Sequence, residues 1–110
     1  MRSAAILYKE EEAGVITQHD DGSFTFRYND NWVADIGKQS IGLTLPKTQQ
    51  EYKSQYLFPF FYNMLPEGSN KQMACKFMRI DTDDYFGLLM ITAKTDSIGA
   101  IRVIKTEQEL

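Results

Sequence analysis

A run of strictly alternating residues at positions 24–28, FTFRY, constrains the fold of this chain more than any other feature. Successive side chains of a β-strand point to opposite faces of a sheet, so a period of two puts the three aromatic rings on one face and polar groups on the other. The Asp21-Gly22 dipeptide before the run suits the positive φ angles of a tight hairpin turn. We therefore expect a strand whose aromatic face lies in the core.

Further strands are predicted on both sides of this run. SAAILYK and GVITQ, separated by the charged loop EEEA, predict a hairpin that continues into the aromatic strand as a three-stranded antiparallel meander. SIGAIRVI, near the end of the chain, predicts a strand with Ile101 and Val103 on one face. SIGLTLP predicts a short strand stopped by Pro46, which cannot donate to a ladder. YNDNWVADIGKQ is loop-like, and KTQQEYKSQY is expected to be irregular and on the surface.

Helices are predicted in the second half. The first begins near Pro59, carries Phe61, Met64 and Leu65 at helical spacing, and ends before Pro66, because the residue before a proline is pushed away from α geometry. A second helix begins at the capping-box pair Ser69 and Gln72. Its apolar stripe, with Cys75 lying off it, consists of Met73, Phe77 and Ile80.

The third predicted helix, YFGLLMITA, is apolar around almost its full circumference and can be capped by Asp83 or Asp84. A helix of this kind must be buried on most sides. Because so small a domain has little interior, we expect a partner to cover part of this helix.

These elements predict an α+β fold in a single domain spanning residues 1–110. The N-terminal strands and the C-terminal strand form an antiparallel sheet, which could close toward a barrel, and two or three helices pack against it.

Composition excludes several classes of function. With 43% hydrophobic and 25% charged residues the chain is ordinary for a globular domain. A net charge of −3, with twelve Lys and Arg and no basic run, gives no footprint for nucleic acid. No apolar stretch has the length of a membrane span, and no signal-peptide pattern is present. The single cysteine, Cys75, suits a reducing compartment. We expect a cytoplasmic protein that binds neither nucleic acid nor membrane.

The sequence predicts no catalytic residue, cofactor site or metal site. His19 is the only histidine, and the HDD turn at 19–21 is more typical of solvated residues than of a cation site. No glycine-rich phosphate loop and no kinase catalytic-loop pattern is present. The DTDD cluster at 81–84 is explained by helix capping. Glu67 has no titratable partner, so we expect it to stabilise a turn or cap a helix rather than to act as an acid or base.

The motifs in this order resemble the N-terminal subdomain of HipA-type toxin kinases. FFYNMLPEG is similar to the F-x-N-L-L-P-E-G signature of that family, and SIGLTLP to its serine-leucine-proline strand. DDYFGLLMITAKTDSIGAIRV is similar to the segment that ends in aspartate, two variable residues and Gly-Ala, although Ala93, Lys94 and Thr95 stand where the family often has glycines. The resemblance covers roughly residues 4 to 104 and includes no part of the kinase core.

This resemblance implies a stand-alone, HipS-like antitoxin. Its expected partner is a HipA-like kinase core of the shortened HipT type, with a HipB-like DNA-binding protein in the same complex. The contact is expected to involve the corner Pro66-Glu67-Gly68 and the adjacent apolar residues, which are Phe61, Met64 and Leu65. Trp32 could be a further anchor of this interface, since tryptophan is enriched in hot spots, or it could fold back over the sheet.

Two other readings stay open. The chain could be the architectural N-terminal part of a full-length HipA-type kinase, in which the docking surface is buried within one polypeptide. It could also be an unrelated small enzyme, which a cluster of titratable groups in one pocket would indicate.

Overall fold

The computed structural model describes residues 1–65, 72–73, 75–77, 79–81, 83–92 and 101–105. The strands are β1 (Arg2–Tyr8), β2 (Glu11–Gln18), β3 (Phe24–Tyr28), β4 (Glu51–Ser54) and β5 (Ile101–Lys105). The helices are α1 (Asp30–Ala34), α2 (Pro59–Tyr62) and α4 (Tyr85–Thr92). Within these residues no helix is long and apolar enough to span a membrane.

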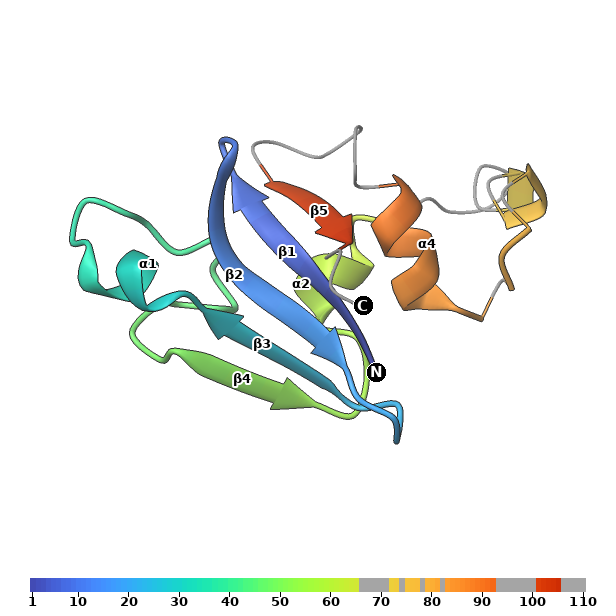
Figure 1. The fold of residues 1–110 in the computed structure, drawn as a ribbon, viewed down its shortest axis with the longest axis horizontal. Helices are drawn as coiled ribbons and strands as arrows, with labels where there is room; N and C mark the ends of the chain where they lie inside the picture. Colours follow the sequence, from blue (N-terminus) through green and yellow to red (C-terminus); the bar gives the residue numbers. More distant parts are fainter. Residues whose placement is uncertain (66–71, 74, 78, 82, 93–100, 106–110) are drawn as a thin grey trace.

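The five strands form one antiparallel sheet in the order β4-β3-β2-β1-β5 (Figure 1). The predicted α+β class, the N-terminal meander and the C-terminal strand are confirmed. Closure into a barrel is wrong, because β4 and β5 lie at opposite edges and do not pair with each other. The sheet instead buries its apolar face against α2 and α4, so its core is covered without closure.

Two tight turns connect the meander. Lys9 and Glu10 have φ angles of 52° and 69°, which is the geometry of a two-residue type I′ turn, and this turn matches the right-handed twist of the strands that it joins. The charged loop is therefore shorter than expected, and β2 already begins at Glu11. The second turn contains Gly22 at a φ of 90°, and His19 and Ser23 close it with a backbone hydrogen bond of 2.8 Å.

The aromatic face of β3 organises the core, as its alternation predicts. Phe24, Phe26 and Tyr28 are buried, whereas Arg27 on the opposite face is exposed. The ring of Phe26 lies 5.8 Å from that of Phe61 on α2, measured between ring centroids. The ring of Phe24 lies 5.7 Å from that of Phe86 on α4. Both helices thus pack on the sheet at β3.

Helix α4 is buried within this chain, and it occupies most of the interior that the sheet offers. Buried residues follow one another along it without a polar interruption: Phe86, Leu88, Leu89 and Met90. Ile101 and Val103 of β5 are also buried, on one face, as predicted. No partner is needed to bury these four residues, because the sheet and the neighbouring segments already cover them. The expectation that a partner covers part of α4 stays a prediction for the rest of the helix.

Residues 40–46 do not form the expected strand. Tyr28 fixes this segment from within the core, because its hydroxyl donates to the Leu45 carbonyl and accepts from the Ile41 amide. The backbone at Gly42 lies so close to the Phe60 ring that an added Cβ would meet it at 2.5 Å. The segment therefore packs as turns over buried aromatic rings and does not join the sheet.

The fourth strand is instead Glu51–Ser54, within a segment that we expected to be irregular. Its alternation is weak because an edge strand of four residues is mostly exposed, and only Tyr52 packs against the core. Helix α1 likewise interrupts the expected loop after β3.

The apolar stripe of the second predicted helix faces the wrong way. Residues 72–73 and 75–77 are helical, but Met73 is 69% exposed and Phe77 is 88% exposed, whereas Cys75 is buried in the core. Among the described residues of this stretch, Cys75 packs in the core, Ile80 is half-buried, and Met73 and Phe77 are left on the surface. Ala74 and Met78 lie outside the described residues.

Two phenylalanines that differ in burial test this core. Phe26 has no exposed surface, so replacement by alanine should lower the free energy of unfolding by about 3–5 kcal/mol. The matched change Phe77→Ala should alter it by less than about 0.5 kcal/mol, because that ring is already in solvent. Urea denaturation of both variants measures the difference. Equal losses would mean that the core is not built around β3.

Candidate docking surface

The residues that lead into the predicted contact corner belong to the core. Phe61 is fully buried, with its ring 6.3 Å from that of Phe58, and Leu65 is almost as buried. Met64 is half-buried and packs against the same core. Residues 66–68, Pro-Glu-Gly, lie outside the described residues. Phe61 and Leu65 can therefore hold the corner in place, but little of their surface is available for direct contact with a partner.

Trp32, the other anchor considered for a partner, folds back over the sheet. Its ring packs edge-on against Tyr8 with centroids 5.9 Å apart, and its indole Nε1 donates to the Gln39 carbonyl at 2.9 Å. The Lys38 ammonium lies 5.1 Å from the centre of the ring. With only 3% of its surface exposed, Trp32 supports the loop after α1 and has almost no surface to offer a partner.

A groove that the sequence did not indicate runs between α2, the start of α4 and the segment that precedes α2. We call it the tyrosine groove. It has a volume of about 350 Å³, and its walls include Tyr56, Tyr62, Asp83 and Tyr85. The rings of Tyr62 and Tyr85 meet edge to face at 5.4 Å, and 77% of Tyr56 and 46% of Tyr62 are exposed. The tyrosines come from three separate segments, so no spacing in the sequence could have predicted that they lie close together.

The acidic end of this groove is held by an ion pair. Asp84 caps α4 by accepting the Gly87 amide at 3.1 Å, and it pairs with the Arg2 guanidinium at 2.7 Å. The hydrogen bond from Arg2 holds the pKa of Asp84 below its usual value. Arg2 also lies 5.3 Å from the centre of the Phe86 ring and donates to Gln18 at 2.9 Å. Asp84 therefore serves as the cap that its sequence position predicted.

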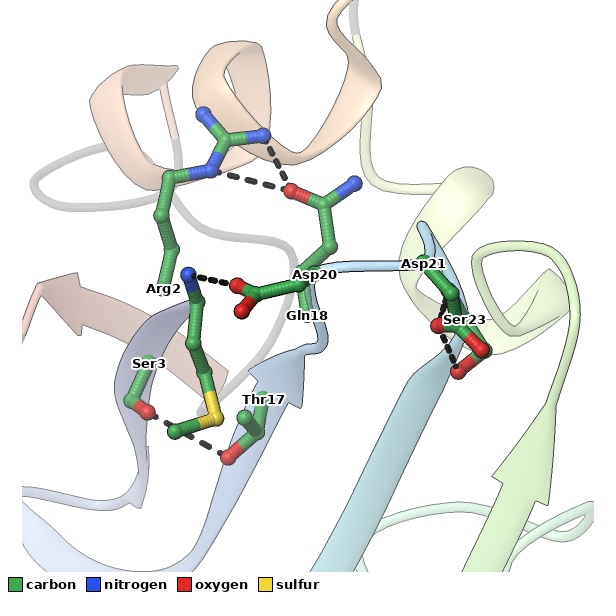
Figure 2. A network of polar contacts seen from close by, with 8 residues as sticks. Arg2, Ser3, Thr17, Gln18, Asp20, Asp21 and Ser23 are labelled. Carbon is green, nitrogen blue, oxygen red and sulfur yellow. Dashed lines mark hydrogen bonds and ion pairs between the residues drawn. The ribbon is translucent and has the colours of Figure 1, made fainter.

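The HDD turn is occupied by local contacts (Figure 2). The Met1 amino group donates to Asp20 at 2.6 Å, and this contact lowers the pKa of Asp20. Asp21 accepts from the Ser23 hydroxyl and amide, which lowers its pKa as well. His19 Nε2 lies 2.7 Å from the Thr25 hydroxyl. No group of three potential metal ligands occurs among the described residues.

A second concave surface lies on the opposite face of the sheet, which we call the open face. No helix that the structure describes packs on it. Most of its residues are polar and come from four adjacent strands, including Ser3, Thr17, Thr25 and Lys53. Phe24 and Tyr56 line it at the edge that it shares with the tyrosine groove. Ser3 and Thr17 lie 3.3 Å apart through their hydroxyls across β1 and β2 (Figure 2). Such a face resembles an ordinary solvated sheet surface more than a docking site.

Comparison with known proteins places this fold in a family. Residues 4–104 match the family model described as HipA N-terminal domain. An uncharacterised protein of Haemophilus influenzae is 30% identical over 108 residues, which are 98% of this chain and 96% of that protein. A protein of Sinorhizobium fredii described as a putative kinase is 27% identical over 87% of this chain, which matches only 23% of that protein.

Solved structures show the same fold. A structure of the N-terminal domain of HipA toxin superposes with a TM-score of 0.73 at 24% identity, over 99% of this chain and 96% of that one. The HipA of Shewanella oneidensis, solved in complex with HipB and operator DNA, superposes with a TM-score of 0.76 at 18% identity. The match covers 97% of this chain and 24% of that one.

The Arg2–Asp84 pair predicts a specific pH dependence. Because the pKa of Asp84 is depressed in the folded chain, its contribution to stability is present above its ordinary value of 3.8 and is lost as the pH falls through the folded pKa. Asp84→Asn keeps a capping side chain but removes the charge, so it should lower the free energy of unfolding at neutral pH by up to about 1 kcal/mol.

Urea denaturation at a series of pH values checks this, since the wild type and the variant share every other acidic group. The difference between the two should shrink as Asp84 becomes protonated in the wild type. A difference that stays constant from neutral to acidic pH would mean that the ion pair does not stabilise the fold.

Proposed function

Because this chain belongs to the HipA N-terminal domain family, we propose that it is a non-catalytic antitoxin or regulatory subunit that binds a HipA-like kinase core and restrains it. The observation that carries the proposal is the extent of the match. Residues 4–104 correspond to a HipA N-terminal domain, while this chain spans about a quarter of the putative kinase and of the HipA chain to which it is similar. The remainder of such a kinase would be the partner.

The exposed apolar side chains support a docking role. Met73 and Phe77 are large, adjacent along one helical stretch and mostly in solvent. Exposed apolar side chains that group together favour a protein interface. Met64 and the Pro66–Gly68 corner follow α2 on the chain and would be part of the contact, with Phe61 and Leu65 contributing through the core in which they are buried. Trp32 would act only indirectly, by holding the loop after α1.

Restraint would be steric or conformational. Within the described residues the acidic groups are engaged in caps, turns and ion pairs or lie singly on the surface, and no group of three potential metal ligands occurs. A HipB-like DNA-binding protein would join the same complex through the kinase. The acidic chain itself, at a net charge of −3, offers no basic surface to DNA.

A second candidate is favoured by the same quarter-length match. If the chain is the N-terminal part of a longer kinase, its docking surface would be an intramolecular interface and its role architectural. Both candidates use one surface, and they differ in whether the kinase core is a separate polypeptide.

The test is to titrate the chain into a purified HipA-like kinase core from the same genome and to follow complex formation together with autophosphorylation. An antitoxin should bind with a dissociation constant at or below about 1 μM and suppress phosphotransfer in proportion to occupancy. Binding with unchanged activity would reduce the role to a scaffold. Failure to bind at 100 μM would contradict the proposal.

A pair of variants locates the contact. Met64→Asp should weaken the complex at least tenfold, because it introduces a charge beside the corner, whereas Lys53→Asp on the open face should leave the affinity unchanged. The opposite order would place the kinase on the open face of the sheet.

A further inference from the structure

We propose that the tyrosine groove receives an arginine side chain of the partner, an inference that rests on the proposed function and specifies how the kinase core is recognised. The groove includes Tyr62, the last residue of α2, which precedes the predicted corner in the sequence.

The shape and walls of the groove suit a single long side chain. Its volume of about 350 Å³ is at the small end of the range for binding pockets. Tyr62 and Tyr85 supply ring surfaces that meet edge to face, and Tyr56 lines the groove from the segment before α2. Aromatic faces attract a guanidinium or ammonium group through the ring quadrupole, and this attraction grows as water is excluded.

The charge of the groove selects a cation. Two carboxylates, those of Asp83 and Asp84, line it, and its lining contains no lysine or arginine. Asp84 is already paired with Arg2, whereas Asp83 is exposed and its carboxylate forms no ion pair among the described residues. The carboxylate of Asp83, in a groove that three tyrosines line, therefore remains available to an incoming cation.

The chain contains an internal precedent for this recognition. Arg2 lies over the Phe86 ring at 5.3 Å and donates to both Asp84 oxygens, at 3.0 and 2.7 Å. This is a bidentate arginine–carboxylate pair on an aromatic face. One residue away, the exposed Asp83 lines the groove together with Tyr62 and Tyr85, so a carboxylate and aromatic rings again occur in one site. Arginine fits it better than lysine, because only the planar guanidinium can stack on a ring and bind a carboxylate with two hydrogen bonds.

The groove can be tested first without the kinase. We would titrate the isotope-labelled chain with N-acetyl-arginine amide and follow the amide resonances of residues 56–62 and 83–86 by NMR. N-acetyl-citrulline amide is the control, because it has nearly the same shape and no charge. At low ionic strength the arginine compound should bind at least fivefold more tightly, and Asp83→Asn should remove that preference. Equal binding of the two compounds, or shifts confined to other residues, would overturn the proposal.

The kinase complex provides the second test. Asp83→Asn and Tyr62→Ala should each weaken the complex five- to twentyfold, and Tyr62→Phe should retain most of the affinity, because the ring rather than the hydroxyl forms the wall. Glu51→Gln removes an equal charge from the open face and should have no effect. The effect of Asp83→Asn should diminish at high salt, since an exposed ion pair is screened.

The outcomes separate this inference from the proposed function. A kinase that binds equally well to the wild type, Asp83→Asn and Tyr62→Ala would overturn the groove as its contact and leave the antitoxin role intact. A groove that prefers the arginine compound in a chain that binds no kinase core would overturn the proposed function and retain the guanidinium site.

Discussion

The three aromatic side chains on the inner face of β3 are the constraint on which the rest of this domain depends. Phe26 contacts α2 through Phe61, Phe24 contacts α4 through Phe86, and the Tyr28 hydroxyl holds the segment 41–45 over the core. Burial raises the pKa of Tyr28, so this hydroxyl stays protonated and continues to donate across the ordinary pH range. One strand therefore contacts two helices and a loop, and the sheet does not need to close to protect its apolar face.

This arrangement divides the molecule into two unlike faces. The open face presents hydroxyls and charged ends along adjacent strands, as solvated antiparallel sheets do. The helical face contains the tyrosine groove, which α2 and the start of α4 line. Since the tyrosines of the groove are held by backbone that packs on the core, a partner would meet side chains that are already positioned, which reduces the entropy lost on binding.

The sequence predicted structure best where burial of one face requires apolar residues at a regular spacing. The alternation of β3, the paired Ile101 and Val103, and the capping Asp84 were all predicted, because each follows from local geometry. The polar residues of β4 led us to predict an irregular segment, because an exposed edge strand needs no apolar pattern. The helical periodicity of Met73 and Phe77 also gave a wrong prediction, because periodicity identifies an apolar face without saying whether the core has room for it. The tyrosine groove was unpredictable for a different reason: it is formed by residues from three segments that only the tertiary fold brings together.

Hydrogen exchange of the chain, alone and with the kinase core, tests most directly whether docking uses the helical face. We predict slower exchange in residues 55–65 and 83–90 on complex formation, and unchanged exchange in β2 and β3, whose amides are already in the sheet. Protection confined to the edges of the sheet or to the segment 35–45, with residues 55–65 and 83–90 unaffected, would contradict it and would assign recognition to a different surface.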